Sequence, residues 1–134
     1  MISFSRILIV DDSSMMRTVI RRSLKMAKVE AEEIVEAGNG LDALHALELN
    51  RFDVMFCDLN MPECSGDELI ERLMSADALP IPPIIIISSE ASTERIDRLN
   101  CQRIVGVLRK PFSPELIVEL LLRTEQSLKQ SVSI

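Results

Sequence analysis

The chain has 134 residues and a formal net charge of −6, with 15 basic and 21 acidic residues. This length fits one domain with a full-size core, and the apolar run after Met1 is too short for a signal peptide or a membrane span. The acidic balance, the absence of Trp and Tyr and a total of four Phe argue against nucleic-acid binding, which needs phosphate neutralisation and base stacking. We therefore expect a cytoplasmic protein that binds no nucleic acid and does not insert into membranes.

Short apolar runs alternate along the chain with segments of helical periodicity. The pattern predicts strands at 6–10, 34–37, 54–58, 84–88 and 105–108, and helices at about 14–28, 40–50, 66–75, 93–100 and 114–127. Five β/α units predict an α/β fold, a five-stranded parallel doubly wound sheet with helices on both faces. We expect one domain over residues 1–126 and a short polar tail at 127–134 that frays.

Four of the five predicted strands lead into residues that phosphate chemistry can use. These follow the first, third, fourth and fifth strands in turn: Asp11 and Asp12, Asp58, Ser88, and Lys110. In an open parallel sheet the carboxyl ends of the strands lie along one edge, where ligands bind. We therefore expect the carboxylates, the hydroxyl and the ammonium to meet at one site.

The chemistry of this set favours a metal-assisted phosphoryl site. Three neighbouring carboxylates repel one another unless a proton or a cation lies among them, and Mg²⁺ prefers such oxygen ligands. Asp58 stands alone after its strand and suits a nucleophile that forms an acyl phosphate, with Lys110 to offset charge and Ser88 to hydrogen-bond a phosphoryl oxygen. Taken singly, the same residues also have structural roles: Asp11 or Asp12 as a helix cap, Ser88 as a loop cap and Lys110 as a solvated side chain.

Other reactive side chains give no competing site. Cys57, Cys64 and Cys101 lack the spacing of a metal site, and Cys57 falls inside a strand and reads as a core residue. His45 has no cysteine or second histidine to complete a metal set.

The last predicted helix carries one apolar stripe that reads as its core face. Val118 and Leu122 fall off that stripe, four residues apart. They are either incidental exposed apolar residues or part of a surface for a partner protein.

Four motifs also occur together, in this order: Val10-Asp11-Asp12-Ser13, Asp58-Leu59-Asn60-Met61-Pro62 followed by Gly66, Ser88-Ser89-Glu90-Ala91, and Lys110-Pro111-Phe112. In this combination they resemble the response-regulator receiver domain of two-component signalling, over nearly the whole chain. The resemblance implies a flavodoxin-like sheet with the strand order 2-1-3-4-5. It also implies a single-domain response regulator without an output domain, similar to stand-alone chemotaxis receivers.

The resemblance further implies a role for each residue at the strand ends. Asp58 is the implied phosphoacceptor for a sensor histidine kinase or phosphotransfer protein, with weak self-phosphorylation and self-dephosphorylation. Mg²⁺ is held by Asp11 or Asp12, by Asp58 and by the backbone carbonyl of Asn60.

The remaining implied roles concern switching and hydrolysis. Ser88 is the implied switch hydroxyl and Lys110 the phosphate partner, with a cis bond to Pro111. Asn60 and Glu90 match positions that tune dephosphorylation. Phosphorylation is read by a downstream protein target on the face of helix four, strand five and helix five.

Two departures from the family pattern concern that face. Val107 stands where the family usually has an aromatic residue or histidine, so the aromatic rotamer switch is missing and weaker coupling is expected. The stretch Leu99-Asn100-Cys101-Gln102-Arg103 lacks the usual glycine-containing turn, which predicts a fourth helix that is either short or mobile.

Two other classes of protein compete with this interpretation. A phosphatase of the haloacid dehalogenase type uses an aspartyl phosphate, but it carries its nucleophile in an Asp-x-Asp pattern after the first strand. A flavin carrier of flavodoxin type needs a Ser/Thr/Gly-rich loop after the first strand and aromatic rings to stack the flavin. This chain offers Asp11-Asp12-Ser13-Ser14 at that place, and neither Trp nor Tyr.

Overall fold

A computed structural model describes residues 2–76, 80–89 and 93–132. Strands and helices alternate in the part of the chain that it describes. The strands are β1 (Ser3–Val10), β2 (Glu30–Ala37), β3 (Val54–Asp58), β4 (Ile84–Ser88) and β5 (Ile104–Arg109). The helices are α1 (Ser14–Met26), α2 (Gly40–Leu49), α3 (Gly66–Ser75), α4 (Thr93–Leu99) and α5 (Pro114–Val132).

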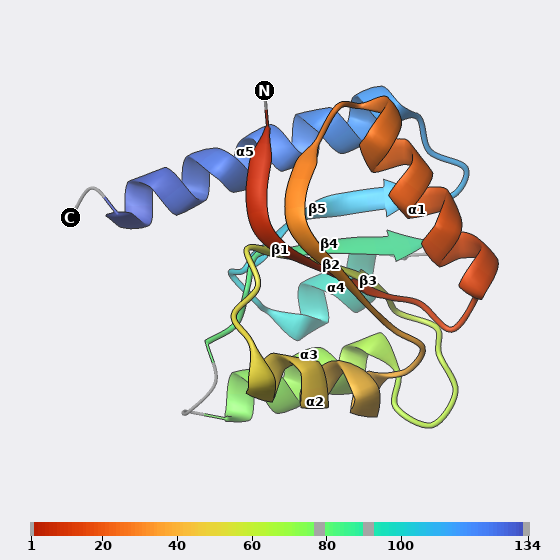
Figure 1. The fold of residues 1–134 in the computed structure, drawn as a ribbon. Helices are drawn as coiled ribbons and strands as arrows, with labels where there is room; N and C mark the ends of the chain where they lie inside the picture. The colour runs from red at the N-terminus through yellow and green to blue at the C-terminus, as the bar shows by residue number, and fades with distance from the viewer. Residues whose placement is uncertain (1, 77–79, 90–92, 133–134) are drawn as a thin grey trace.

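The strands form one parallel sheet in the order β2-β1-β3-β4-β5. Helices α1 and α5 cover one face of the sheet, and α2, α3 and α4 cover the other (Figure 1). The predicted fold class, a doubly wound flavodoxin-like sheet, is therefore confirmed.

The three central strands supply apolar side chains to both faces of the sheet. Leu8 and Val10 of β1 pack on the side of α2 and α3, whereas Ile7 and Ile9 pack on the side of α1 and α5. This alternation follows from the two-residue period of a strand. Cys57 is fully buried in β3, as expected for a core residue.

Two strands start several residues earlier than predicted, and β5 starts one residue earlier. The pairing of β1 with β2 begins at Ser3 and Glu30, well before the apolar runs that identified these strands. Backbone hydrogen bonds extend the ladder through polar residues. Polar side chains are tolerated there because β2 is an edge strand whose side chains are partly exposed.

The last two helices differ in how well their lengths were predicted. As expected, α4 is short, with seven residues. The predicted end of the last helix at about residue 127 was wrong, because α5 continues to Val132. Leu128 packs against the core on the side of α1, which holds this part of α5 on the domain.

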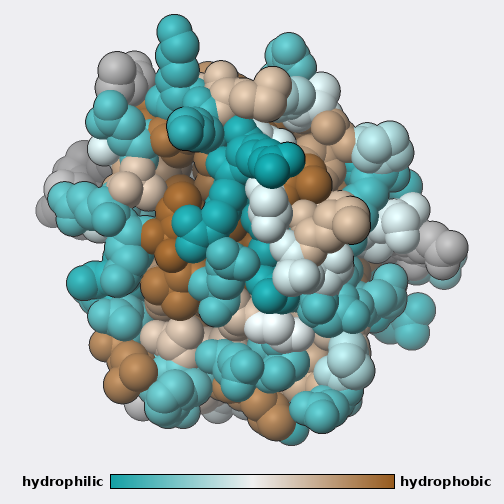
Figure 2. Space-filling view, turned by 45° about the vertical axis from the view of Figure 1, so that its right-hand side comes forward, coloured by the Kyte–Doolittle hydropathy of each residue, from teal (hydrophilic) through white to brown (hydrophobic). Residues whose placement is uncertain are grey.

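Most of the face in Figure 2 is hydrophilic, with hydrophobic side chains showing between. Among the described residues, the exposed large apolar side chains are Met15, Val19, Met26, Leu41, Leu49, Met74 and Leu122. No helix in the described ranges is long and apolar enough to cross a membrane.

Candidate functional site

The acidic pair lies in the turn between β1 and α1. The backbone N–H of Asp11 donates to the carbonyl oxygen of Ala37 at 3.1 Å, which continues the ladder of β1 and β2 by one residue. The Asp11 carboxylate is fully buried and accepts a hydrogen bond from the Ser13 N–H at 2.9 Å, whereas Asp12 is exposed. The Ser13 hydroxyl oxygen accepts from the Met16 N–H at 3.2 Å, so Ser13 caps α1 and both aspartates are available for other roles.

The guanidinium of Arg17 connects this turn to the end of β2. Arg17 donates to the main-chain oxygen of Asp11 at 2.6 Å and to Glu36 at 2.7 Å, and Arg21 donates to the other oxygen of Glu36 at 2.5 Å. Burial raises the pKa of Glu36, but the two arginines outweigh it and hold this pKa below its ordinary value. The sequence alone does not indicate this cluster, because Glu36 comes from β2, whereas Arg17 and Arg21 lie four residues apart on α1.

Asp58 ends β3 beneath the first turn of α3. Its carboxylate is nearly buried and accepts a hydrogen bond from the Asn60 N–H at 3.1 Å. Gly66, the first residue of α3, allows a close approach, since a Cβ there would lie 2.3 Å from the Asp58 carbonyl oxygen. The helix start therefore packs directly on the backbone that carries the candidate nucleophile.

The pKa of Asp58 is raised above its ordinary value. The main cause is burial, which disfavours the charged form, and the neighbouring charges of Asp11 and Asp12 act in the same direction. The Asn60 N–H and the Lys110 ammonium oppose this rise without cancelling it. A cation placed among the carboxylates would relieve the same cost.

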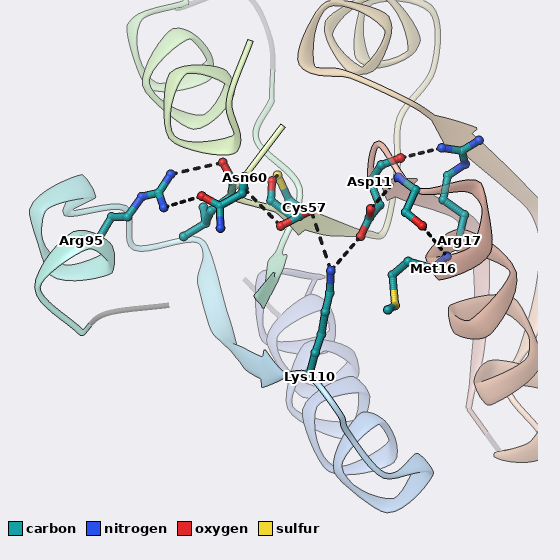
Figure 3. A network of polar contacts seen from close by, with 10 residues as sticks. Asp11, Met16, Arg17, Cys57, Asn60, Arg95 and Lys110 are labelled. Atoms are coloured by element: carbon teal, nitrogen blue, oxygen red, sulfur yellow. Dashed lines mark hydrogen bonds and ion pairs between the residues drawn. The ribbon is translucent and has the colours of Figure 1, made fainter. Parts of the chain in front are cut away.

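Lys110 points between two of the carboxylates (Figure 3). Its ammonium nitrogen lies 3.4 Å from an oxygen of Asp11 and 3.8 Å from an oxygen of Asp58. The backbone N–H of Lys110 donates to the carbonyl oxygen of Ser88 at 3.1 Å, which holds the end of β5 beside the end of β4. Ser88 is fully buried, and the bond from Lys110 to Pro111 is cis.

The donor set at this edge of the sheet fits a hard divalent cation. Carboxylate oxygens of Asp11, Asp12 and Asp58 all lie within 4.8 Å of one another. Two of these residues are buried and Asp12 is exposed, so the cluster opens toward solvent on one side. Oxygen ligands with an open side suit Mg²⁺, which retains water and accepts phosphate oxygens.

Asn60 lies beside this cluster, with its side chain held from α4. Arg95 donates to the Asn60 side-chain oxygen at 2.8 Å and forms an ion pair with Asp67 in the first turn of α3. No local sequence pattern indicates the pair of Arg95 and Asp67, because the two residues lie far apart in the chain. Glu90 lies outside the described residues.

The face of α4, β5 and α5 shows how the departures from the family pattern are accommodated. Val107 of β5 is partly buried and packs against the core on the side of α2 and α3. Val118 is partly buried on the other side of the sheet, whereas Leu122 is 44% exposed. Of the two apolar residues that fell off the core stripe of α5, only Leu122 is exposed.

The strand order and the position of the acidic cluster define a class of protein. The chain is a flavodoxin-like α/β protein whose strand ends carry carboxylates and a lysine rather than a phosphate-binding loop. The family model described as the response regulator receiver domain matches residues 7–122. The chain therefore belongs to the response regulator receiver domain family, and it is a response regulator of two-component signalling.

The most similar relatives include chemotaxis proteins. Chemotaxis protein CheY1 of Helicobacter pylori is 32% identical over 117 residues, which cover 87% of this chain and 93% of the relative. The crystallised chemotaxis protein CheY4 of Vibrio cholerae is 31% identical, with a TM-score of 0.71 over 90% of this chain and 98% of the relative.

A third relative was solved with a metal ion. It is the receiver domain of the sensor histidine kinase PA1611 of Pseudomonas aeruginosa, with a magnesium ion coordinated in its active-site cleft. It is 25% identical to this chain, with a TM-score of 0.72, and the match covers 89% of this chain and 95% of the relative.

Proposed function

We propose that Asp58 accepts a phosphoryl group from a phosphohistidine of a sensor histidine kinase or phosphotransfer protein. A carboxylate oxygen of Asp58 attacks phosphorus, an O–P bond forms, and the P–N bond to the imidazole breaks. The imidazole nitrogen keeps the electron pair and takes a proton from solvent. The observation that carries this proposal is the placement of Asp58 at the end of β3, 3.8 Å from the Lys110 ammonium and beside the acidic pair.

The residues around Asp58 have complementary roles in this proposal. Lys110 offsets negative charge on the transferred group, because its ammonium nitrogen lies 3.8 Å from an oxygen of Asp58. The Ser88 hydroxyl, at the adjoining strand end, hydrogen-bonds a phosphoryl oxygen. Oxygens of Asp11, Asp12 and Asp58 and the Asn60 carbonyl hold Mg²⁺, which offsets the negative charge of phosphoryl oxygens when it is bound.

The output of the protein is binding to another protein through the face of α4, β5 and α5. Exposed Leu122 of α5 contributes an apolar contact there. The similarity to the two chemotaxis proteins supports a role in chemotaxis signalling.

Phosphotransfer from the histidine kinases of the source organism tests the proposal and identifies the partner. Each kinase is labelled with radioactive phosphate and mixed with wild type, Asp58→Asn or Asp53→Asn. We expect rapid transfer from one or a few kinases to wild type and to Asp53→Asn, and none to Asp58→Asn. Equal labelling of all three proteins would contradict the assignment of Asp58.

A further inference from the structure

Arg95 of α4 makes four hydrogen bonds to residues that follow β3. Its Nε donates to one oxygen of Asp67 at 2.7 Å, and an Nη donates to the other oxygen. Its two Nη groups also donate to the Asn60 side chain at 2.8 Å and to the Leu59 carbonyl oxygen at 3.2 Å. One side chain therefore joins α4 to both the loop after β3 and the start of α3. Figure 3 shows the contacts of Arg95 with the loop, beside Asn60.

These contacts fix the orientation of α4 rather than only its burial. Ile96 and Leu99 pack α4 against the core, but apolar contacts have little directional preference. A guanidinium paired with both oxygens of a carboxylate has a defined geometry. The Arg95 and Asp67 side chains are 32% and 21% exposed, so solvent screens this pair only in part.

The same guanidinium lies within electrostatic reach of the candidate phosphoacceptor. Arg95 holds the side chain of Asn60, and the backbone N–H of Asn60 donates to the Asp58 carboxylate at 3.1 Å. The pKa of Arg95 is raised, mainly by the hydrogen bonds to Asp67 and also by the charge of Asp58. Arg95 therefore pairs with Asp67 and also contacts Asn60, whose backbone N–H donates to the Asp58 carboxylate.

We propose that Arg95 transmits the charge state of Asp58 to α4. The proposal rests on the phosphoacceptor role of Asp58. Conversion of its carboxylate to an acyl phosphate adds one negative charge beside the loop that Arg95 contacts. The added charge competes with Asp67 for the guanidinium, and α4 follows Arg95 because the side chain is anchored in this helix. Arg95 then has two positions, one paired with Asp67 and one closer to the phosphoryl group. The helix shifts to the extent that the phosphoryl group interacts more favourably with the second position.

Backbone amide NMR with Mg²⁺ and beryllofluoride, a phosphoryl mimic, tests the link. In wild type we expect shifts both at Asp58 and Lys110 and at residues 96–99 of α4. In Arg95→Met the shifts at Asp58 and Lys110 remain and those at residues 96–99 are lost. Arg98→Met is the matched control, because it removes the same charge from an exposed position of the same helix and retains both sets of shifts.

Asp67→Asn separates transmission from a merely structural role. This variant keeps Arg95 but removes the charge that holds it. We therefore expect the α4 amide chemical shifts of the free variant to lie closer to those of the wild-type beryllofluoride complex. A full α4 response in Arg95→Met, or α4 shifts in Asp67→Asn unrelated to those of the complex, would overturn the proposal. Failure of beryllofluoride to shift Asp58 in wild type would instead contradict the proposed function.

Discussion

The guanidinium of Arg17 donates a 2.6 Å hydrogen bond to the main-chain carbonyl oxygen of Asp11. Arg17 also pairs with Glu36 at the end of β2, so the turn that bears the acidic pair is tied to the edge strand of the sheet. The position of the buried Asp11 carboxylate thus depends on residues outside the carboxylate cluster itself.

The Glu36 cluster gives a pH dependence of stability. The pKa of Glu36 is lowered in the folded protein. Its contribution to the unfolding free energy is therefore fully present above the ordinary glutamate pKa of 4.5 and is lost as the pH falls through the lower folded value. We expect Glu36→Gln to lower the denaturant midpoint at neutral pH, and the difference from wild type to shrink below about pH 4.5. Glu33→Gln is the control, because its pair with Arg6 is exposed and contributes little. A difference in denaturant midpoint between wild type and Glu36→Gln that stays the same at every pH would refute this role.

Mg²⁺ should stabilise the folded protein by mass action. At a free concentration about a hundredfold above the dissociation constant, the expected gain in unfolding free energy is about 2.7 kcal/mol. Asp12→Ala removes one carboxylate of the cluster and should reduce that gain, whereas Asp42→Ala, on the exposed surface of α2, should leave it unchanged. Thermal unfolding with chelator and with Mg²⁺ measures the effect. A wild-type melting temperature that does not respond to millimolar Mg²⁺ would rule out the metal site.

Gly66 should be essential for the geometry of Asp58. Gly66→Ala places a Cβ where only 2.3 Å separates it from the Asp58 carbonyl oxygen, so the start of α3 must move. We expect a loss of about 1–3 kcal/mol in unfolding free energy and weaker Mg²⁺ binding. Gly38→Ala is the matched control, since the nearest atom to its Cβ lies at 3.6 Å. Equal stability and Mg²⁺ affinity in both variants would show that the close packing at Gly66 is unimportant.

Val107 should limit the coupling between Asp58 and the α4 face. Valine is small and stiff about χ1, so it cannot fill the space behind a displaced Ser88 by a rotamer change. Phosphorylation is then read through backbone displacement, and the NMR shifts of β5 and α4 should be smaller than in a relative with an aromatic residue at this position. Shifts as large and cooperative as those of such a relative, recorded in parallel, would show that Val107 does not weaken the switch.

The sequence predicted the elements whose signal is local. Apolar runs located β3 and β4 to the residue, because both strands are buried on both faces. The early start of β2 was missed because an edge strand with exposed glutamates carries no apolar pattern. The continuation of α5 to Val132 was missed because the tail from Ser127 is mostly polar, although Leu128 falls on the apolar stripe of this helix.

The same distinction holds for the site. Asp11, Asp12, Asp58 and Lys110 were expected together because parallel strand ends share an edge, and the structure brings them together. Arg17 and Arg95 could not be identified in this way, since their partners come from other elements and depend on how helices pack on the sheet.

Intact-mass spectrometry after incubation with Mg²⁺ and acetyl phosphate tests the central claim most directly. Wild type should gain one phosphoryl group that survives acid and is removed by base, as expected of an acyl phosphate, and Asp58→Asn should gain none. Asp53→Asn, which alters an aspartate just before β3, should be labelled like wild type. Undiminished labelling of Asp58→Asn would show that Asp58 is not the phosphoacceptor.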